Sequence, residues 1–350
     1  MIADVQRVLD RTVAAELAPG MVAEVRDGDR SWFGSAGVSD TATGRERRQD
    51  ERFRIGSASK AFTATVVLKL VAEGRLSLDD TLDKHLPGLF DGSAYEPGRI
   101  TIRQLLNQTS GLYAYSNDEK FFAKGVGAEW FQHRDDAYTP EQLVRIALAH
   151  PPVDEPGRRF GYSNTNYVLA AMIVERVTGR TFDQELVRNV SRPLRLTGTS
   201  LPVADPGIAG PHPVHYSTLF SADPKPEIHD ATRMNQSFAW AAGGVISTTT
   251  DLNQFFAALF GGHVLPAELL REMLTTVPTE GWIPGTRYGL GVFEQELPCG
   301  ATVWGNGGAT YGSWCYSMGA RDGGHRLTAQ VNGDWAPLSV FDDVLAAEFC

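Results

Sequence analysis

Apolar residues repeat with helical spacing at the start of the chain and with strand spacing soon after it. A helix is predicted over residues 4–17, where the apolar positions share one face and Pro19-Gly20 ends the pattern. The runs 21–26 and 31–34 flank Asp27-Gly28-Asp29, which predicts two strands joined as a hairpin.

The middle of the chain, from about 75 to 235, is dominated by helical patterns that Pro and Gly interrupt. Thr139-Pro140-Glu141 supplies a cap, a proline at the first helical position and an early acid, which together predict a helix start. A second helix is predicted over 167–177, ended by Thr178-Gly179. Residues 202–226 contain six prolines and are expected to be irregular.

Strand patterns return near the carboxyl end. A capped helix over 251–260 precedes apolar runs at 288–293, 301–304, 314–318 and 327–331, and a last helix is expected from about 338 to 349. We therefore predict an α+β fold, in which an antiparallel sheet built from both chain ends is flanked by terminal helices. Residues 1–75 and 236–350 would form a sheet lobe, and 76–235 a mostly helical lobe with the active site in the cleft between them.

Composition excludes several classes of protein. The 350 residues are 42% hydrophobic and 21% charged, which is an ordinary globular balance. The formal net charge of −10 argues against binding to nucleic acid or to an anionic membrane, because both need clustered Lys and Arg. No apolar run approaches the ~20 residues that a spanning helix needs.

Signals for compartment, cofactor and metal are weak. The start, Met1 to Val5, has no basic segment before an apolar one, so a cytoplasmic protein is expected as the sequence stands, or a secreted one if Met1 replaces a cleaved signal peptide. The three cysteines allow one disulfide and a thiol, or three thiols. There is no CxxC or HExxH motif, and we expect neither a metal nor a cofactor.

The segment Ser57-Ala58-Ser59-Lys60 is the first candidate for chemistry. One helical turn separates Ser57 from Lys60, so both project from one face. A lysine amine can take the proton of a serine hydroxyl if burial lowers its pKa, and a helix start favours developing negative charge. The alternative is a solvated lysine beside a helix-capping serine.

Two further segments are candidates. Tyr162-Ser163-Asn164 offers a phenol for proton transfer and an amide that can hold both a lysine and a substrate carbonyl. The same letters occur at 115–117, but the position just before a predicted helix favours the copy at 162. The glycine-rich run 304–309 would let a ligand approach the backbone. A turn is the alternative for each segment, and a glycine hairpin for the last.

Taken in this order, these segments resemble the penicillin-recognising serine enzymes: D-Ala-D-Ala peptidases, class C β-lactamases and related esterases and aminopeptidases. The chain is most similar to the secreted Streptomyces DD-carboxypeptidase type. The resemblance extends over nearly the whole chain and rests on the segments 53–60, 70–78, 101–106, 109–112, 162–167 and 243–248.

The resemblance implies a role for each candidate. Ser57 would be the acylated nucleophile, Lys60 and Tyr162 the proton-transfer pair, and Asn164 the group that orients the substrate amide. The backbone N–H groups of Ser57 and Ala309 would form an oxyanion hole. Further substrate contacts would come from the residues Asn306, Gly307, Gly308, Phe121, Phe122, Phe238 and Trp240. Cys299 and Cys350 would form a disulfide in an oxidising compartment, which leaves Cys315 free.

The third motif departs from the family pattern. It usually begins with His or Lys, followed by Thr or Gly and then Gly, whereas this chain has Asn306-Gly307-Gly308. The site therefore loses a cation, and Gly307 and Ala309 stand where hydroxyls are expected. The preceding strand, 291–296, has no Arg or Lys to hold a substrate carboxylate. Each lost charge-assisted bond is worth roughly 1.5–3 kcal/mol.

Three functions follow as hypotheses. The first is a serine acyl hydrolase or acyltransferase of specialised metabolism, acting on a small-molecule or peptide-like amide or ester. The second is a D-Ala-D-Ala carboxypeptidase or weak β-lactamase. The third is a binding protein that stalls after acylation or has lost the chemistry. The acyl donor, the acceptor, the stereochemical preference and the oligomeric state stay open.

Overall fold

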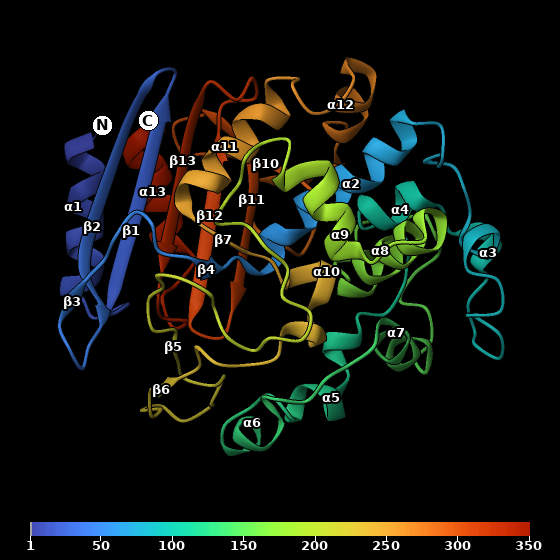
Figure 1. The fold of residues 1–350 in the computed structure, drawn as a ribbon, viewed down its shortest axis with the longest axis horizontal. Coiled ribbons are helices and arrows are strands. Elements are labelled where there is room, and N and C mark those ends of the chain that lie inside the picture. Colours follow the sequence, from blue (N-terminus) through green and yellow to red (C-terminus); the bar gives the residue numbers. More distant parts are fainter. Residues whose placement is uncertain (1) are drawn as a thin grey trace.

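A nine-stranded antiparallel sheet joins the two ends of the chain (Figure 1). The structure is a computed structural model that describes residues 2–350. In spatial order the strands are β3 (Arg45–Glu46), β2 (Arg30–Asp40), β1 (Gly20–Asp27), β13 (His325–Val331), β12 (Ser313–Gly319), β11 (Thr302–Thr310), β10 (Phe293–Glu296), β9 (Thr286–Tyr288) and β8 (Val277–Pro278). The central pair β1–β13 brings Met21 opposite Val331. The predicted α+β fold is confirmed.

The two faces of the sheet are covered by different helices (Figure 1). The helices α1 (Ile2–Ala14) and α13 (Ser339–Phe349) pack on one face, where alternate strand residues such as Ala23 and Ala329 join their apolar side chains in one buried cluster. The helix α11 (Thr249–Phe260) lies on the other face and bonds to it through polar groups. Asn253 donates to the Glu24 carbonyl at 2.9 Å and accepts from Thr328 at 2.8 Å. Alternation along the strands therefore separates an apolar face from a polar, hydrogen-bonded one.

Helices fill the middle of the chain, as predicted. Besides α1, α11 and α13, the helices of the described residues are α2 (Ser59–Ala72), α3 (Leu82–His85), α4 (Ile102–Leu106), α5 (Glu119–Ala123), α6 (Ala128–His133), α7 (Pro140–Leu148), α8 (Asn164–Thr178), α9 (Phe182–Leu186), α10 (Trp240–Gly243) and α12 (Ala267–Met273). Short 3-10 turns lie at Gly56–Ala58 (η1), Pro97–Arg99 (η2), Tyr115–Asn117 (η3) and Gln236–Phe238 (η5), and a π-helical turn at Val187–Ser191 (η4). Two small ladders pair β4 (Phe53–Arg54) with β7 (Ile246–Ser247) and β5 (Tyr216–Ser217) with β6 (His229–Asp230).

The predicted helix at 139–141 is confirmed in detail. Thr139 caps α7 by accepting from the Gln142 backbone N–H, while the Gln142 side chain accepts from the Thr139 N–H. Pro140 stands at the first helical position, where its missing N–H costs nothing. The helix predicted over 167–177 begins earlier, at Asn164, and ends at Gly179 with a left-handed φ of 70°. Asn164 is therefore held by the first turn of α8.

Two strand predictions were wrong in extent. The run 288–293 is not one strand, because β9 ends at Tyr288 and the chain reverses so that Phe293 pairs with Tyr288. Gly291 adopts a φ of 76° in this reversal. The strand expected over 301–304 continues to Thr310, so the glycine-rich segment lies inside β11, paired with β12. The hairpin turn falls later, at Tyr311-Gly312.

The largest buried cluster combines apolar residues of α2 with residues of α4, α7 and α8. Leu68 and Leu169 are among its fully buried members. Since this cluster combines residues from both sides of position 75, the division into two lobes stays a prediction.

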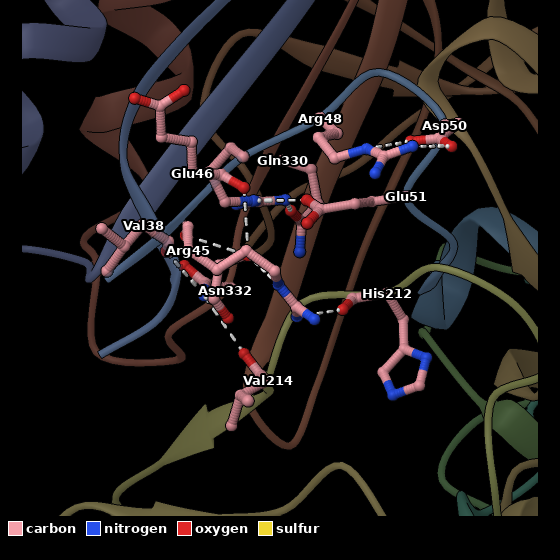
Figure 2. A network of polar contacts seen from close by, with 12 residues as sticks. Val38, Arg45, Glu46, Arg48, Asp50, Glu51, His212, Val214, Gln330 and Asn332 are labelled. Atoms are coloured by element: carbon pink, nitrogen blue, oxygen red, sulfur yellow. Dashed lines mark hydrogen bonds and ion pairs between the residues drawn. The ribbon is translucent and has the colours of Figure 1, made fainter. Parts of the chain in front are cut away.

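A network of polar contacts, buried at Arg47 and exposed at Arg45, holds the segment that leads to Ser57 (Figure 2). The Arg47 guanidinium donates to Glu51 at 2.7 Å and to the Gln330 side chain of β13 at 2.6 Å. Arg45 donates to the His212 carbonyl at 2.8 Å, and Asn332 donates to the Val214 carbonyl at 3.1 Å. The proline-rich segment is thereby fastened to the sheet beside the approach to β4.

The carboxyl-terminal part of the sheet region is also linked covalently. Cys299, between β10 and β11, forms a disulfide with Cys350 after α13, and Cys315 is a buried free thiol. The pairing implied by the family resemblance is confirmed. Over residues 2–350, every helix is too short or too polar to cross a bilayer.

Candidate active site

Ser57 lies in a tight turn between β4 and α2. Gly56 adopts a φ of 51°, a conformation that a side chain disfavours, and this lets the chain turn from the strand into η1. Ser57 therefore belongs to the 3-10 turn, and the regular α-helix begins two residues later, at Ser59. Ser57 is half-buried and lines a cavity.

Lys60 is fully buried and points at Ser57. Its Nζ lies 3.0 Å from Ser57 Oγ, 2.8 Å from Asn164 Oδ1 and 2.9 Å from the carbonyl oxygen of Ala242. Burial lowers the pKa of Lys60 well below its usual value, because the charged form loses the solvation that water provides. These contacts join the turn after β4, the start of α8 and the turn of α10 around one nitrogen.

The partners of Nζ define how a neutral amine would be oriented. A carbonyl oxygen accepts hydrogen bonds and donates none, so Asn164 Oδ1 and the Ala242 carbonyl take the two N–H groups of the amine. The remaining lone pair faces Ser57 Oγ, whose hydroxyl proton it can accept. This arrangement fits a general base that acts on the serine.

Tyr162 reaches the same hydroxyl from the other side. Its phenol donates to Ser57 Oγ at 2.7 Å, and Lys60 Nζ lies 4.8 Å from the centre of its ring. The ring stacks on Trp282 with centroids 5.5 Å apart, which fixes its direction. Burial raises the pKa of Tyr162 well above its usual value, with the neighbouring Tyr288 as a further cause. Tyr162 therefore keeps its proton when Lys60 is neutral.

The second Tyr-Ser-Asn copy, treated as a turn in the sequence, lies in the same site. Asn164 Nδ2 donates to Ser116 Oγ at 3.0 Å, so the amide is held with its oxygen towards Lys60. Tyr115 donates to the Phe238 carbonyl at 2.6 Å, which connects η3 to the cavity wall. Ser116 was not predicted as a site residue, and the duplicated letters were the signal that pointed to it.

Two glycines bring the backbone of β11 against η1. A Cβ on Gly56 would lie 2.7 Å from Ala309 N, and one on Gly308 would lie 2.3 Å from Ser57 N. Only residues without a side chain allow this approach, and it places the Ser57 and Ala309 amides near each other. Two amides at such a position are suited to a developing oxyanion.

Asn306 is buried beneath this contact and bonds to the backbone. Its Nδ2 donates to the Gly291 carbonyl at 2.7 Å, and its Oδ1 accepts from the Gly307 N–H at 2.8 Å. Both ends of the amide are therefore used structurally, and a neutral residue stands where the family has a cation. Gly307 lies against the Tyr316 ring, which a Cβ would meet at 2.5 Å.

A cavity of about 240 Å³ opens beside Ser57. Asn164 and Ala309 lie in its wall, as do the predicted substrate contacts Phe121, Phe122 and Phe238. Trp240 does not line it: its indole is buried against Phe182, with ring centroids 5.8 Å apart. Trp240 belongs to the buried apolar cluster and has a left-handed φ of 36°, and its role as a substrate contact stays a prediction.

Within residues 2–350, the His, Cys, Asp and Glu side chains form no group of three or more that could hold a metal ion. The chemistry that the site can support is carried by the hydroxyl, amine, phenol and amide groups described above.

Comparisons with known proteins agree on one family. The family model described as "Beta-lactamase" matches residues 5–330. A D-stereospecific amidohydrolase from Streptomyces sp. has a TM-score of 0.92 and 44% identity, over 99% of this chain and 98% of that one. The D-amino acid amidase from Ochrobactrum anthropi SV3, solved with L-phenylalanine amide, has a TM-score of 0.83 and 26% identity, over 99% and 97% of the two chains.

The curated relatives are more distant and longer. Penicillin-binding protein 4* of Bacillus subtilis (strain 168) is 30% identical over 184 residues, which are 51% of this chain and 37% of that protein. Protein flp of Staphylococcus aureus (strain N315) is 28% identical over 207 residues, which are 56% and 38% of the two proteins. The matches thus span less than two fifths of the length of these relatives.

Proposed function

We propose, from the premise that the chain belongs to the beta-lactamase family of serine hydrolases, that it cleaves amides or esters of D-amino acids through an acyl-enzyme on Ser57. The observation that carries this proposal is the environment of Lys60 Nζ. Two carbonyl oxygens lie within hydrogen-bond distance of Nζ, so in the neutral amine they would accept from its N–H groups while its lone pair faces the Ser57 hydroxyl.

The steps of the reaction follow from these contacts. As Ser57 Oγ bonds to the substrate carbonyl carbon, its proton passes to Lys60, and the backbone N–H groups of Ser57 and Ala309 donate hydrogen bonds to the oxyanion. When the C–N bond breaks, Tyr162 gives its proton to the leaving nitrogen and regains one from the Lys60 ammonium. Water then attacks the ester carbon, and a proton returns to Ser57 Oγ as the acid leaves.

The preference for a D-configured acyl group rests on the relatives. The name of the Streptomyces neighbour describes a D-stereospecific amidohydrolase, and that protein shares 44% of its residues over nearly the whole chain. Aromatic residues such as Phe121 and Phe238 line the cavity, which suits an apolar side chain on the acyl residue. A role in specialised metabolism stays a prediction.

The strand next to β11 supports an amide or ester substrate over one with a terminal carboxylate. The strand β10 carries the acid Glu294, which pairs with Arg287 of β9 at 3.3 Å, so this strand offers no cation of its own to a carboxylate. Gly307 and Ala309 offer no hydroxyl to a carboxylate. Both features favour an amidohydrolase over a D-Ala-D-Ala carboxypeptidase.

Mass spectrometry after labelling with a fluorophosphonate tests the nucleophile. We expect one label on Ser57, its loss in Ser57→Ala, and its retention in the control Ser163→Ala, whose hydroxyl has no hydrogen-bond partner among residues 2–350. Hydrolysis of N-acetyl-D- and N-acetyl-L-phenylalanine p-nitroanilide then tests the stereochemistry, and the D-form should react faster. A label elsewhere, or faster hydrolysis of the L-form, would contradict the proposal. Release of D-Ala from an acyl-D-Ala-D-Ala peptide would favour the carboxypeptidase hypothesis.

A further inference from the structure

Three aromatic side chains form the outer end of the cavity, and we name Phe122, Phe220 and Tyr311 the aromatic mouth. The ring centroids of Phe122 and Phe220 are 6.4 Å apart, and those of Phe220 and Tyr311 are 4.9 Å apart. Phe122 is 52% exposed and Phe220 is 45% exposed. Single exposed apolar residues are common, but paired ones at a cavity entrance indicate a binding surface.

The backbone beneath Phe220 is held in a conformation that side chains disfavour. Leu219 and Phe220 have consecutive left-handed φ values of 52° and 50°. Leu219 is fully buried, its N–H donates to Ser217 Oγ at 2.9 Å, and its carbonyl accepts from Gly127 N–H at 2.9 Å. Such strain persists where surrounding contacts impose it, and it is concentrated at functional sites.

One carboxylate ties the aromatic mouth to the end of β11. Asp334 accepts from Gly312 N–H at 3.0 Å, from Thr218 N–H at 3.1 Å and from Ser217 Oγ. Gly312 belongs to the turn that carries Tyr311, and β11 ends just before this turn. The position of Phe220 is thereby coupled to the strand that presents the Ala309 amide.

The position of Tyr162 indicates which part of a substrate reaches this mouth. Tyr162 lies outside the cavity lining, whereas Ser57, Asn164 and Ala309 form part of it. Since the leaving group must receive its proton from Tyr162, it lies on the Tyr162 side of Ser57. The acyl group therefore extends into the cavity, and its far end approaches the aromatic mouth.

The charges along the cavity disfavour an acyl donor with a free ammonium group. Of the lining residues within 2–350, Asp136 is the only carboxylate, and its Oδ2 already lies 2.8 Å from His133 Nδ1. Lys124 Nζ lies 3.9 Å from the same oxygen. An ammonium group would have to displace these partners, whereas an acylated nitrogen would not.

We propose that the aromatic mouth binds a second apolar group, attached through an acylated nitrogen beyond the residue at the scissile bond. The preferred acyl donors are then N-acylated or dipeptide-like D-amino acid derivatives with two apolar groups, and Phe220 determines this specificity. The inference rests on the proposed acyl-enzyme function and specifies its substrate class.

Two donors that differ by one phenyl ring test the inference. We compare kcat/KM for N-phenylacetyl- and N-acetyl-D-phenylalanine p-nitroanilide, and we expect the wild type to prefer the phenylacetyl donor roughly tenfold, as one well-placed apolar group allows. Phe220→Ala should reduce this preference at least about fivefold. The matched control is Phe131→Ala, which removes an equally exposed phenyl ring (46%) outside the lining; it should keep the preference.

A binding measurement separates failure of the inference from failure of the proposed chemistry. Calorimetry with Ser57→Ala and the two corresponding amides should show the same preference in Kd, whether or not the wild type turns the donors over. Equal Kd values and equal kcat/KM values for the two donors would overturn the inference. Preferential binding without turnover would support the aromatic mouth and contradict the acyl-enzyme proposal.

Asp334 is a positioning residue in this scheme, since it contacts the backbone next to Phe220 and Tyr311, at Thr218 and Gly312, and not the substrate. Asp334→Asn should lower the phenylacetyl preference through KM, with a smaller change in kcat for the acetyl donor. A purely structural role would lower the melting temperature and reduce both donors alike. That result would remove Asp334 from the inference and leave the Phe220 test in force.

Discussion

Lys60 shows how its surroundings prepare a single side chain for proton transfer. Among the described residues, no carboxylate contacts Lys60 Nζ. The atoms that contact it are neutral oxygens of Ser57, Asn164 and Ala242. Burial then favours the uncharged amine, because no opposite charge compensates for the lost solvation. Activity should therefore depend on deprotonated Lys60, and kcat/KM should fall as pH falls through its lowered pKa.

Replacing Asn164 by Asp tests this assignment. A carboxylate in place of Oδ1, 2.8 Å from Nζ, would stabilise the ammonium form and raise the pKa of Lys60 by about 1–3 units. At neutral pH kcat/KM should then fall by roughly 10- to 1000-fold, and it should recover partly as pH rises. The measurement is the pH profile of kcat/KM with an amide or ester substrate.

The control for this variant is Asn117→Asp, which adds the same charge in the second Tyr-Ser-Asn copy. Asn117 is exposed, so its carboxylate would be screened by water. Its pH profile should match that of the wild type. If the acidic limb of the kcat/KM pH profile shifts equally in both variants, the result would contradict a local effect of the new carboxylate on the pKa of Lys60.

At the scale of elements, the contact between η1 and β11 depends on glycine at both surfaces. A Cβ at position 308 would lie 2.1 Å from the Ile55 carbonyl oxygen and 2.3 Å from Ser57 N. These obstacles are backbone atoms, which cannot move aside as a flexible side chain can. The strand and the turn must therefore separate if either surface gains a side chain.

Gly308→Ala should consequently lower both stability and activity. We expect a loss of about 1–3 kcal/mol in the free energy of unfolding, or more, from the overpacked contact. Displacement of an oxyanion donor should also lower kcat by about 10²–10³. Urea unfolding and kcat with an ester substrate would measure the two effects.

Gly44→Ala provides the comparison, because it also adds one methyl group. Gly44 has a φ of 70°, and a Cβ there would meet nothing within 4 Å. It should cost only about 1 kcal/mol of local backbone strain and leave kcat unchanged. If Gly308→Ala loses no more unfolding free energy and no more kcat than this variant, β11 and η1 are not in the contact described.

At the scale of the whole molecule, the sheet depends on the meeting of the two chain ends. The pairing of β1 with β13 joins residues about three hundred positions apart, and the Cys299–Cys350 disulfide fastens α13 to the same layer. The bridge spans 51 positions in the sequence. It restricts the unfolded chain more than it shapes the cavity, which lies at the opposite end of β11.

Cys299→Ser should therefore destabilise the protein without abolishing its chemistry. The expected loss is about 2–4 kcal/mol in the free energy of unfolding, measured with denaturant under oxidising conditions. Dithiothreitol should produce the same loss in the wild type and no further loss in the variant. Fluorophosphonate should still label Ser57 in the folded variant, and a lost label there would link the bridge to the active site.

Much of the site could be predicted because its motifs are local. Ser57 and Lys60 are three residues apart, and Tyr162 and Asn164 flank one helix start, so short segments carry the chemistry. Asn306 could be singled out as a departure from the family pattern, since it is a single letter in a recognisable motif. Ser116 and Phe220 were not predicted, because their importance comes from contacts with residues far away in the sequence.

Periodicity and turn residues by themselves determined the helices, most strands, the α+β class and the order of the candidate motifs, because these depend on interactions between near neighbours. Only the tertiary structure decided that the glycine-rich segment is a strand, that Trp240 enters the core and that two Tyr-Ser-Asn copies meet at one cavity. Those outcomes depend on close packing between segments that are distant in the sequence. Where a neighbouring segment leaves no room for a side chain, no periodic pattern in the sequence reveals it.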